Sequence, residues 1–184
     1  MSIVPSLITH CSPTLAGMKV GSLFSFLSPD WKELARETET LNAQLAPKGL
    51  TLRFLRIDDG RALCYLYRRS QLEKLLEDPA VRAFLSRYGY DSPSMDAVLS
   101  RLLRRMAASG AFPHEIGLFL GYPLSDVIAF IEHHGRGGVC CGCWKAYTNE
   151  REARKTFARF SKCTEVYGRL YRAGRRLTQL TVAA

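Results

Sequence analysis

The strongest structural signal in this 184-residue chain is a β-hairpin at residues 50–68. The runs LTLRFLRI and RALCYLYR are rich in β-branched and aromatic residues, and Asp59-Gly60 lies between them. An Asp-Gly pair readily takes up the positive φ angles of a two-residue hairpin turn. Strand pairing around this turn places Phe54 opposite Tyr65 and leaves Cys64 in mid-strand, as a core thiol.

Helical patterns precede and follow the hairpin. Capping residues, first-turn prolines and apolar residues repeated every three or four positions mark where these helices begin and how they face the core. The predicted helices span residues 13–26, 30–46, 94–110, 113–120, 123–135 and 149–174, and two shorter ones open at Ser70 and Asp78.

Two further segments have the composition of strands. The run VCCGCWKAY at 139–147 is predicted to pair with an edge of the hairpin, and the tail at 177–184 is predicted to form one more short strand. With 47% hydrophobic and 23% charged residues, the chain suits one globular domain over residues 1–184. The predicted class is α+β, mainly helical, with a small antiparallel sheet.

The chain shows no export or membrane signal. Its first 18 residues lack a basic leader with an uninterrupted apolar core, and no run approaches the ~20 apolar residues that span a bilayer. We therefore expect a cytoplasmic protein without a membrane partner. Its six cysteines would stay reduced and serve as buried hydrophobes, metal ligands or reactive thiols.

His10 and Cys11 precede a predicted helix start at Ser12-Pro13. A thiol beside the positive end of a helix can have a depressed pKa. Cys11 is therefore a candidate nucleophile and, with His10, a candidate metal ligand. The alternative is a buried Cys11 beside a surface or capping His10.

His114 and Glu115 lie in the first turn of the helix predicted from Pro113, where an anion site can also form. A catalytic version of the site would use Cys11 as nucleophile and His114 as base, with Glu115 nearby. In the alternative interpretation Glu115 complements the helix dipole and His114 is half-exposed.

The segment Cys140-Cys141-Gly142-Cys143 contains one C-x-x-C pair. With His133, His134 and Cys163 it could complete a tetrahedral zinc or iron site. Structural zinc sites usually show two paired spacings, and only one is present. Cys140 and Cys143 would also face opposite sides of a strand, so joint ligation requires a turn at Gly142.

Trp144, Lys145 and Tyr147 follow the alternation of a strand. Lys145 and Tyr147 would share one side, opposite Trp144. An ammonium beside a phenol can bind an anion or a carboxylate, although an ordinary surface pair has the same pattern.

The net charge of +9 concentrates near the C-terminus, where residues 151–176 hold nine Lys or Arg against two Glu. The segment EIGLFLGYPLSDVIAFIE at 115–132 resembles a helix-turn-helix pattern. Its second helix has no basic residue in its first turns, and Asp126 would repel phosphate. A nucleic-acid-binding regulator that draws phosphate contacts from the last helix is therefore the alternative function.

Three segments together resemble an uncharacterised bacterial domain-of-unknown-function family of single-domain proteins. They are HCSPTLAG with Lys19, PHEIGLFLGYP, and CCGCWKAY followed by Phe157 and Cys163. The resemblance covers essentially the whole chain and implies no established activity. It adds Lys19, Tyr122 and Trp144 to the candidate ligand-binding residues and places the protein in a redox or iron context.

In the family pattern the positions of Cys141 and Cys143 commonly hold other residues, which argues against a family-wide C-x-x-C metal site. Cys11, Cys140 and Cys163 remain as the thiols of interest, with His10 as a further metal ligand. The resulting prediction is a cytoplasmic protein whose thiol and imidazole pocket binds iron, haem or a small anionic ligand. His10, Cys11, His114 and Glu115 would form it, with Lys145 and Tyr147 nearby. The sequence does not decide whether the protein is an enzyme.

Overall fold

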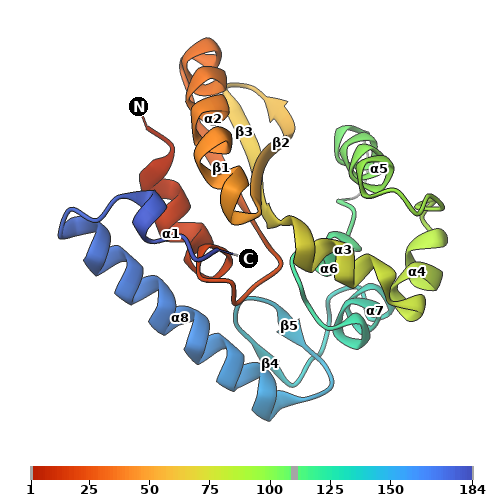
Figure 1. Cartoon of the computed structure of the whole chain (residues 1–184). Helices are drawn as coiled ribbons and strands as arrows, with labels where there is room; N and C mark the ends of the chain where they lie inside the picture. The colour runs from red at the N-terminus through yellow and green to blue at the C-terminus, as the bar shows by residue number, and fades with distance from the viewer. Residues whose placement is uncertain (1, 109–111, 184) are drawn as a thin grey trace.

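A three-stranded antiparallel sheet forms the centre of the fold (Figure 1). The computed structural model describes residues 2–108 and 112–183. In it β3 (Arg61–Arg68) pairs with β2 (Leu50–Asp58) on one side and with β1 (Gly21–Leu27) on the other. Asp59 and Gly60 have φ angles of 44° and 77°, as the predicted hairpin turn requires. The predicted α+β class, mainly helical with a small antiparallel sheet, is confirmed.

A β-bulge at Leu55 changes the predicted register of the hairpin. Phe54 lies opposite Cys64, because the ladder shifts between Phe54 and Arg56. The predicted partner, Tyr65, lies opposite Arg53. One extra residue on β2 therefore moves every pair beyond the bulge by one position.

The third strand is β1, not the segment around Trp144, and the helix predicted over 13–26 is wrong. Residues 4–15 form helix α1 (Val4–Leu15), whose first-turn proline is Pro5, and Pro13 lies near its end. Along β1, Ser22, Phe24 and Phe26 are buried on one face. This two-residue alternation is the period of a strand, and it outweighs the first-turn proline signal at Pro13.

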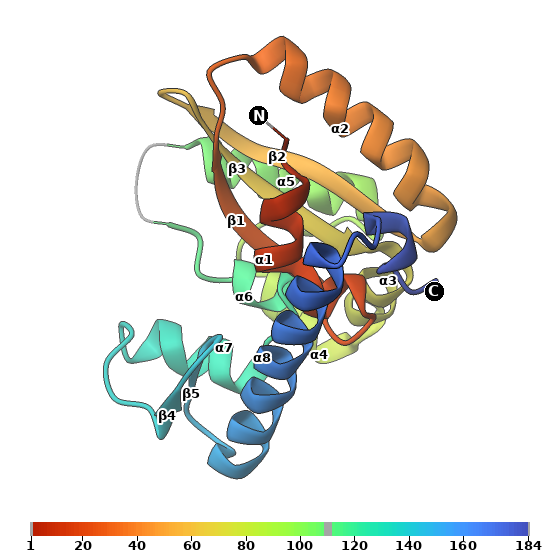
Figure 2. The same ribbon diagram turned by 90° about the vertical axis from the view of Figure 1, so that its left-hand side faces the viewer.

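Helices cover both faces of the sheet, so the fold has three layers (Figures 1 and 2). One face carries α1, α2 (Trp31–Leu45) and α8 (Glu150–Arg172), together with the 3-10 turns Ala46–Lys48 and Leu177–Gln179. The other face carries the helices of the middle of the chain, which are α3 (Arg69–Glu77), α4 (Pro79–Ser86), α5 (Met95–Ala107), α6 (Ile116–Phe119) and α7 (Leu124–Glu132). Each face has its own apolar core.

Most predicted helix starts agree with the structure. The Asp30 carboxylate accepts the amides of Lys32 and Glu33, and the Asp78 and Asn149 side chains cap α4 and α8 in the same way. The helix predicted from Pro113 is shorter than expected, because residues 113–115 precede the single turn of α6. The tail forms a 3-10 turn in place of the predicted strand. The predicted cap at Gly110 lies outside the described residues.

The segment around Trp144 forms a second, smaller hairpin. Its strands β4 (Cys140–Cys141) and β5 (Lys145–Ala146) pair with each other and not with the main sheet. The turn between them includes Gly142, whose amide donates to the carbonyl of Trp144 at 3.0 Å. A Cβ on Gly142 would lie 2.3 Å from the Phe157 ring, so this glycine lets the hairpin approach α8 closely. No described helix is long and apolar enough to cross a membrane.

Candidate functional site

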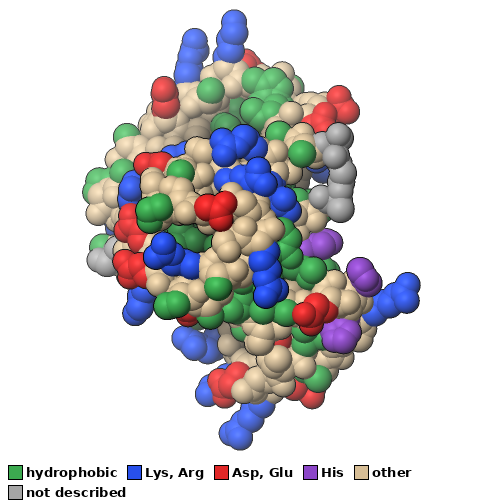
Figure 3. Space-filling view, turned by 90° about the vertical axis from the view of Figure 1, so that its right-hand side faces the viewer, with side chains coloured by type: hydrophobic (Ala, Val, Ile, Leu, Met, Phe, Trp, Pro, Cys, Tyr) green, Lys and Arg blue, Asp and Glu red, His purple; other side chains and the backbone are tan. Residues whose placement is uncertain are grey.

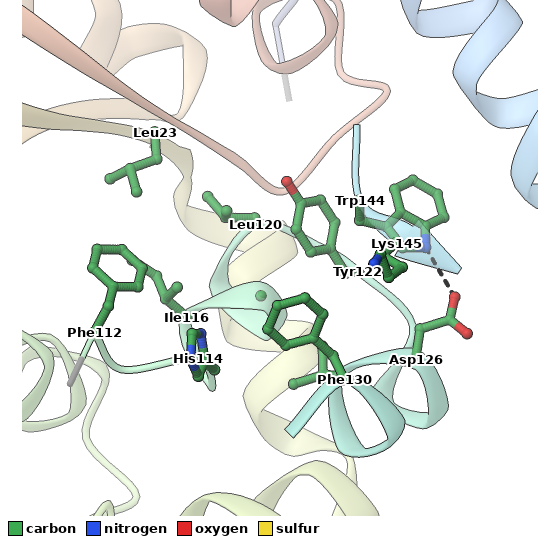
Figure 4. A pocket seen from close by; sticks show the side chains of 12 residues that line it. Leu23, Phe112, His114, Ile116, Leu120, Tyr122, Asp126, Phe130, Trp144 and Lys145 are labelled. Atoms are coloured by element: carbon green, nitrogen blue, oxygen red, sulfur yellow. Dashed lines mark hydrogen bonds between the residues drawn. The ribbon is translucent and has the colours of Figure 1, made fainter. Parts of the chain in front are cut away.

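An apolar cavity of about 210 Å³ lies between the main sheet and the small hairpin (Figure 4). Its walls come from β1, the segment before α6, the helices α6 and α7, and β5. Four residues predicted from the sequence to act in the site line it together: His114, Tyr122, Trp144 and Lys145. The remaining lining residues are Leu23, Phe112, Ile116, Gly117, Leu120, Asp126, Val127 and Phe130.

Five of the twelve residues that line the cavity carry aromatic rings. Tyr122 stacks on Trp144 with ring centroids 5.2 Å apart, and Trp144 meets Phe157 edge to face at 4.5 Å. On the opposite wall His114 packs against Phe130 at 5.1 Å. The rings present flat apolar surfaces to the cavity, which suits a ligand with a planar apolar part.

Asp126 fixes the hairpin wall of the cavity. Its side chain is 3% exposed, and its Oδ2 accepts the Trp144 indole N–H at 2.8 Å (Figure 4). Its Oδ1 accepts the Tyr147 amide at 2.8 Å and, from Thr148, the amide at 3.1 Å and the hydroxyl at 3.0 Å. One buried carboxylate in the first turn of α7 thus orients Trp144 and joins the hairpin to the helix.

Two nitrogen-bearing side chains give the cavity its polar edge. The Lys145 Nζ donates one hydrogen bond, to the Gly135 carbonyl at 2.6 Å, and an ammonium has two further protons to donate. His114 is exposed and adds an imidazole on the opposite wall, beside Phe130. The Asp126 oxygens already accept hydrogen bonds from the hairpin. The groups that remain free to bind a ligand in this cavity are therefore mainly hydrogen-bond donors.

Cys11 and His10 do not reach this cavity, so the predicted pocket joining them to His114 is wrong. Along β1, Leu23 lines the cavity, while its neighbour Phe24 packs with Cys11 in the core on the other face of the sheet. His10 stacks on Phe24 at 5.6 Å. The sheet therefore separates this cysteine and histidine from His114.

The basis for a reactive Cys11 is also absent. Cys11 lies inside α1, not before its first turn, and is fully buried. Burial raises the pKa of the Cys11 thiol, the opposite of the expected depression, and the nearby Lys19 only partly counters this. Cys11 and His114 consequently cannot act as the proposed nucleophile and base without unfolding of the sheet.

Glu115 is adjacent to His114 but faces the core behind the cavity. Its carboxylate is 1% exposed and accepts hydrogen bonds from the Arg105 guanidinium and, at 3.0 Å, from the Tyr90 hydroxyl. The ion pair raises the pKa of Arg105, and burial raises that of Tyr90. Glu115 therefore anchors the segment before α6 to α5, and its paired carboxylate is not available as a base.

The predicted metal ligands are dispersed. His10 and Cys11 lie on α1, the Cys140 Sγ approaches the Glu150 carbonyl at 4.0 Å, and Cys163 lies in the middle of α8. The turn at Gly142 is present, yet the described residues include no group of three or more His, Cys, Asp or Glu side chains placed to hold a metal ion. All six cysteines are free.

Two further predicted ligand-binding residues lie beside the cavity. The Lys19 Nζ is 5.3 Å from the centre of the Tyr122 ring, and burial lowers the Lys19 pKa. The Tyr147 hydroxyl donates to the Arg136 carbonyl at 3.0 Å, and its ring stacks on His133. Lys145 and Tyr147 thus face the same loop, as their predicted alternation requires, but Tyr147 belongs to a separate shallow hollow.

The helix-turn-helix outline corresponds to α6 and α7, joined through Gly121 at φ 78°. α6 is a single buried turn. The first turn of α7 faces the small hairpin, since Asp126 bonds Trp144 and Ser125 bonds Thr148 at 3.4 Å. Asp126 and Val127 are buried, and the nine residues of α7 include no Lys or Arg. This helix therefore lacks the basic side chains with which a recognition helix contacts DNA.

Several lining residues carried no functional signal in the sequence. Leu23, Phe112 and Phe130 are apolar residues of the kind that fill any core, and only tertiary packing brings them together. The sequence could have predicted a structural role for Asp126, because it is an acidic residue inside the apolar run of α7. A buried acid requires partners, and these lie on the hairpin about twenty residues later.

Fold and site together define a three-layer α+β protein with one small aromatic cavity between the main sheet and an added hairpin. The chain belongs to the family described as "Protein of unknown function (DUF3793)", whose model matches residues 7–181. Neither the curated proteins nor the solved structures contain a match to this chain.

Proposed function

We propose that this protein binds a small planar organic anion in the aromatic cavity beside Trp144. The observation that carries the proposal is the combination of flat apolar walls with the spare donors of Lys145 and His114. A cavity of about 210 Å³ is smaller than the roughly 300–1,000 Å³ typical of drug-sized ligands, and cavities of about 150 Å³ accept benzene. A single aromatic ring with one carboxylate matches these dimensions.

The donor set favours an organic anion over the iron and haem also predicted from the sequence. His114 is the single imidazole on the wall, and no thiol lines the cavity among the described residues. A haem, with four pyrrole rings, is also larger than a cavity of about 210 Å³. The redox or metal context, the bacterial source and the cytoplasmic location remain predictions, and the six free cysteines suit a reducing compartment.

Binding rather than catalysis suits the lining residues. The Tyr122 hydroxyl already donates to the Cys143 carbonyl at 2.8 Å, and burial raises the Tyr122 pKa to about 12. The described wall contains no other hydroxyl and no thiol that could serve as a nucleophile.

Ligand-observed NMR with three probes tests the proposal. Benzoate should bind, benzylamine should bind more weakly because its cation meets Lys145, and acetate should not bind because it lacks a ring. For the nine non-hydrogen atoms of benzoate, a binding free energy of about −3 to −5 kcal/mol corresponds to a millimolar Kd.

Leu23→Trp should abolish the benzoate signal by filling the cavity. Leu27→Trp is the matched control, since Leu27 is 61% exposed on the same strand and lies outside the lining. Equal binding of benzoate by both variants, or equal responses to all three probes, would refute the proposal that benzoate binds in this cavity.

A further inference from the structure

The positive charge of this protein is concentrated in the segment that contains α8. Residues 151–176 hold nine Lys or Arg against two Glu, a local excess of seven out of a net charge of +9. The rest of the chain is nearly neutral, and on the face shown in Figure 3 basic and acidic side chains both occur. The helix α8 itself holds seven Lys or Arg against three Glu, and Arg175 and Arg176 follow it. This segment therefore carries an excess of positive charge that the rest of the chain lacks.

The basic residues of α8 form a line along its outer face. Lys155, Lys162 and Arg169 recur every seven residues, which places them on one side of a helix about 10.5 Å apart. Arg151 and Arg172 lie one turn beyond each end. The five side chains are exposed and extend over roughly 32 Å.

The opposite face of α8 is already used in the fold. Ala153 and Phe160 are buried, Tyr167 and Tyr171 pack on the core shared with α1, and α8 runs along the edge of the molecule with its outer side uncovered (Figures 1 and 2). The line of cations is thus directed to solvent by packing on the other side.

Acidic residues neutralise little of this line. Lys162 pairs with Glu165 at 2.8 Å, while Lys155 lies 3.9 Å from Glu152. Among the described residues, Arg151, Arg169 and Arg172 have no carboxylate within ion-pair distance. Exposed i,i+3 pairs are weak and exchange readily with an external anion.

We propose that the outer face of α8 binds the phosphate backbone of double-stranded nucleic acid without reading its sequence. The 32 Å line is close to one turn of the duplex, about 34 Å. Guanidinium groups, which contribute three of the five cations, form paired hydrogen bonds with phosphate. The helix α7 has no basic residue that could reach the bases, so the contacts in this proposal are to the backbone alone.

A membrane surface suits the same face less well. Helices that lie in a bilayer interface insert large apolar side chains, and the exposed large apolar residues of the described chain all lie outside α8. They are Leu27, Ile57, Phe112, Val139 and Val182. The outer face of α8 therefore fits a hydrated polyanion.

Fluorescence anisotropy with a labelled 24-base-pair DNA duplex of arbitrary sequence, measured across salt concentrations, tests this proposal. Five phosphate contacts predict a slope of about −4.5 for log K against log salt, or a roughly 500-fold weaker affinity at 200 mM than at 50 mM salt. The triple variant Lys155→Glu, Lys162→Glu, Arg169→Glu should reduce the magnitude of the slope to below about 2.

The matched control changes Lys32, Arg36 and Lys74, three exposed basic residues of α2 and α3, to Glu. It lowers the net charge by the same amount and should leave the slope unchanged. A second α8 variant with Gln at the three positions keeps the test valid if the Glu variant is misfolded. Equal losses in the α8 and control variants, binding to phosphatidylserine vesicles without binding to duplex, or no binding at 50 mM salt would overturn the proposal.

Discussion

Removal of the Asp126 carboxylate should release the small hairpin from α7. Asp126→Ala deletes an acceptor of four hydrogen bonds, three of them from N–H groups of residues 144–148. Leaving a buried donor unpaired costs about 1–3 kcal/mol. The Thr148 side chain is exposed and can turn to water. We therefore expect a loss of about 4 kcal/mol in the free energy of unfolding, or roughly 8–16 °C in Tm for a domain of this size.

Asp126→Asn gives a smaller and more specific loss. An amide oxygen can retain the three bonds to Tyr147 and Thr148, but the amide nitrogen then faces the Trp144 N–H, and two donors oppose each other. This mismatch should cost about 1–2 kcal/mol. Because Phe has no N–H, Trp144→Phe should be less destabilising in the Asp126→Asn background than in the wild type.

Urea denaturation followed by tryptophan fluorescence compares the two Asp126 variants, and circular dichroism follows the variants with Trp144→Phe. The chain has two tryptophans, so in a Trp31→Phe background the emission reports on Trp144 alone. Equal unfolding midpoints for Asp126→Ala and Asp126→Asn, or native Trp144 emission in Asp126→Ala, would show that Asp126 does not hold the hairpin.

Three other perturbations have defined outcomes. Iodoacetamide should alkylate exposed Cys141 in the folded protein, as peptide mass spectrometry would show. Cys11, whose pKa is raised by burial, should stay unmodified from pH 7 to 9 until urea unfolds the chain. Modification of Cys11 under native conditions would contradict its placement. Arg68→Met should lower the free energy of unfolding by about 3 kcal/mol and Tm by roughly 6–12 °C. The reason is that the buried guanidinium donates to the carbonyls that end α1 and to the Val182 carbonyl. Calorimetry showing an unchanged Tm would contradict this role. Gly21→Ala should lower the free energy of unfolding, measured by urea denaturation, by about 1–3 kcal/mol. The added Cβ would lie 2.5 Å from the Tyr65 ring. An unchanged free energy of unfolding would mean that the ring can move.

Local signals in the sequence were sufficient for much of the fold. The Asp59-Gly60 turn and the caps at Asp30 and Asn149 act through neighbouring backbone groups, and each has the predicted role. Pro13 misled the prediction, because a proline can also occur near the end of a helix. The bulge at Leu55 left no local mark in the sequence. It is seen only in the tertiary structure, where Leu55 packs in one core and Leu52 in the other.

Local signals also predicted part of the site. Trp144, Lys145 and Tyr122 were identified as residues whose types bind ligands, and they do meet at one cavity. Cys11 was misplaced because the boundary of its helix was wrong, which reversed the expected direction of its pKa shift. Whether two distant motifs share a cavity depends on which face of the sheet each one covers, and strand order is a tertiary property.

A crystal structure of the protein soaked with benzoate tests the central claim most directly. We predict density for the ring between Phe130 and Trp144, with the carboxylate within hydrogen-bonding distance of the Lys145 Nζ. Density for benzoate only elsewhere on the surface, or a cavity filled by its own side chains, would contradict the proposed binding site.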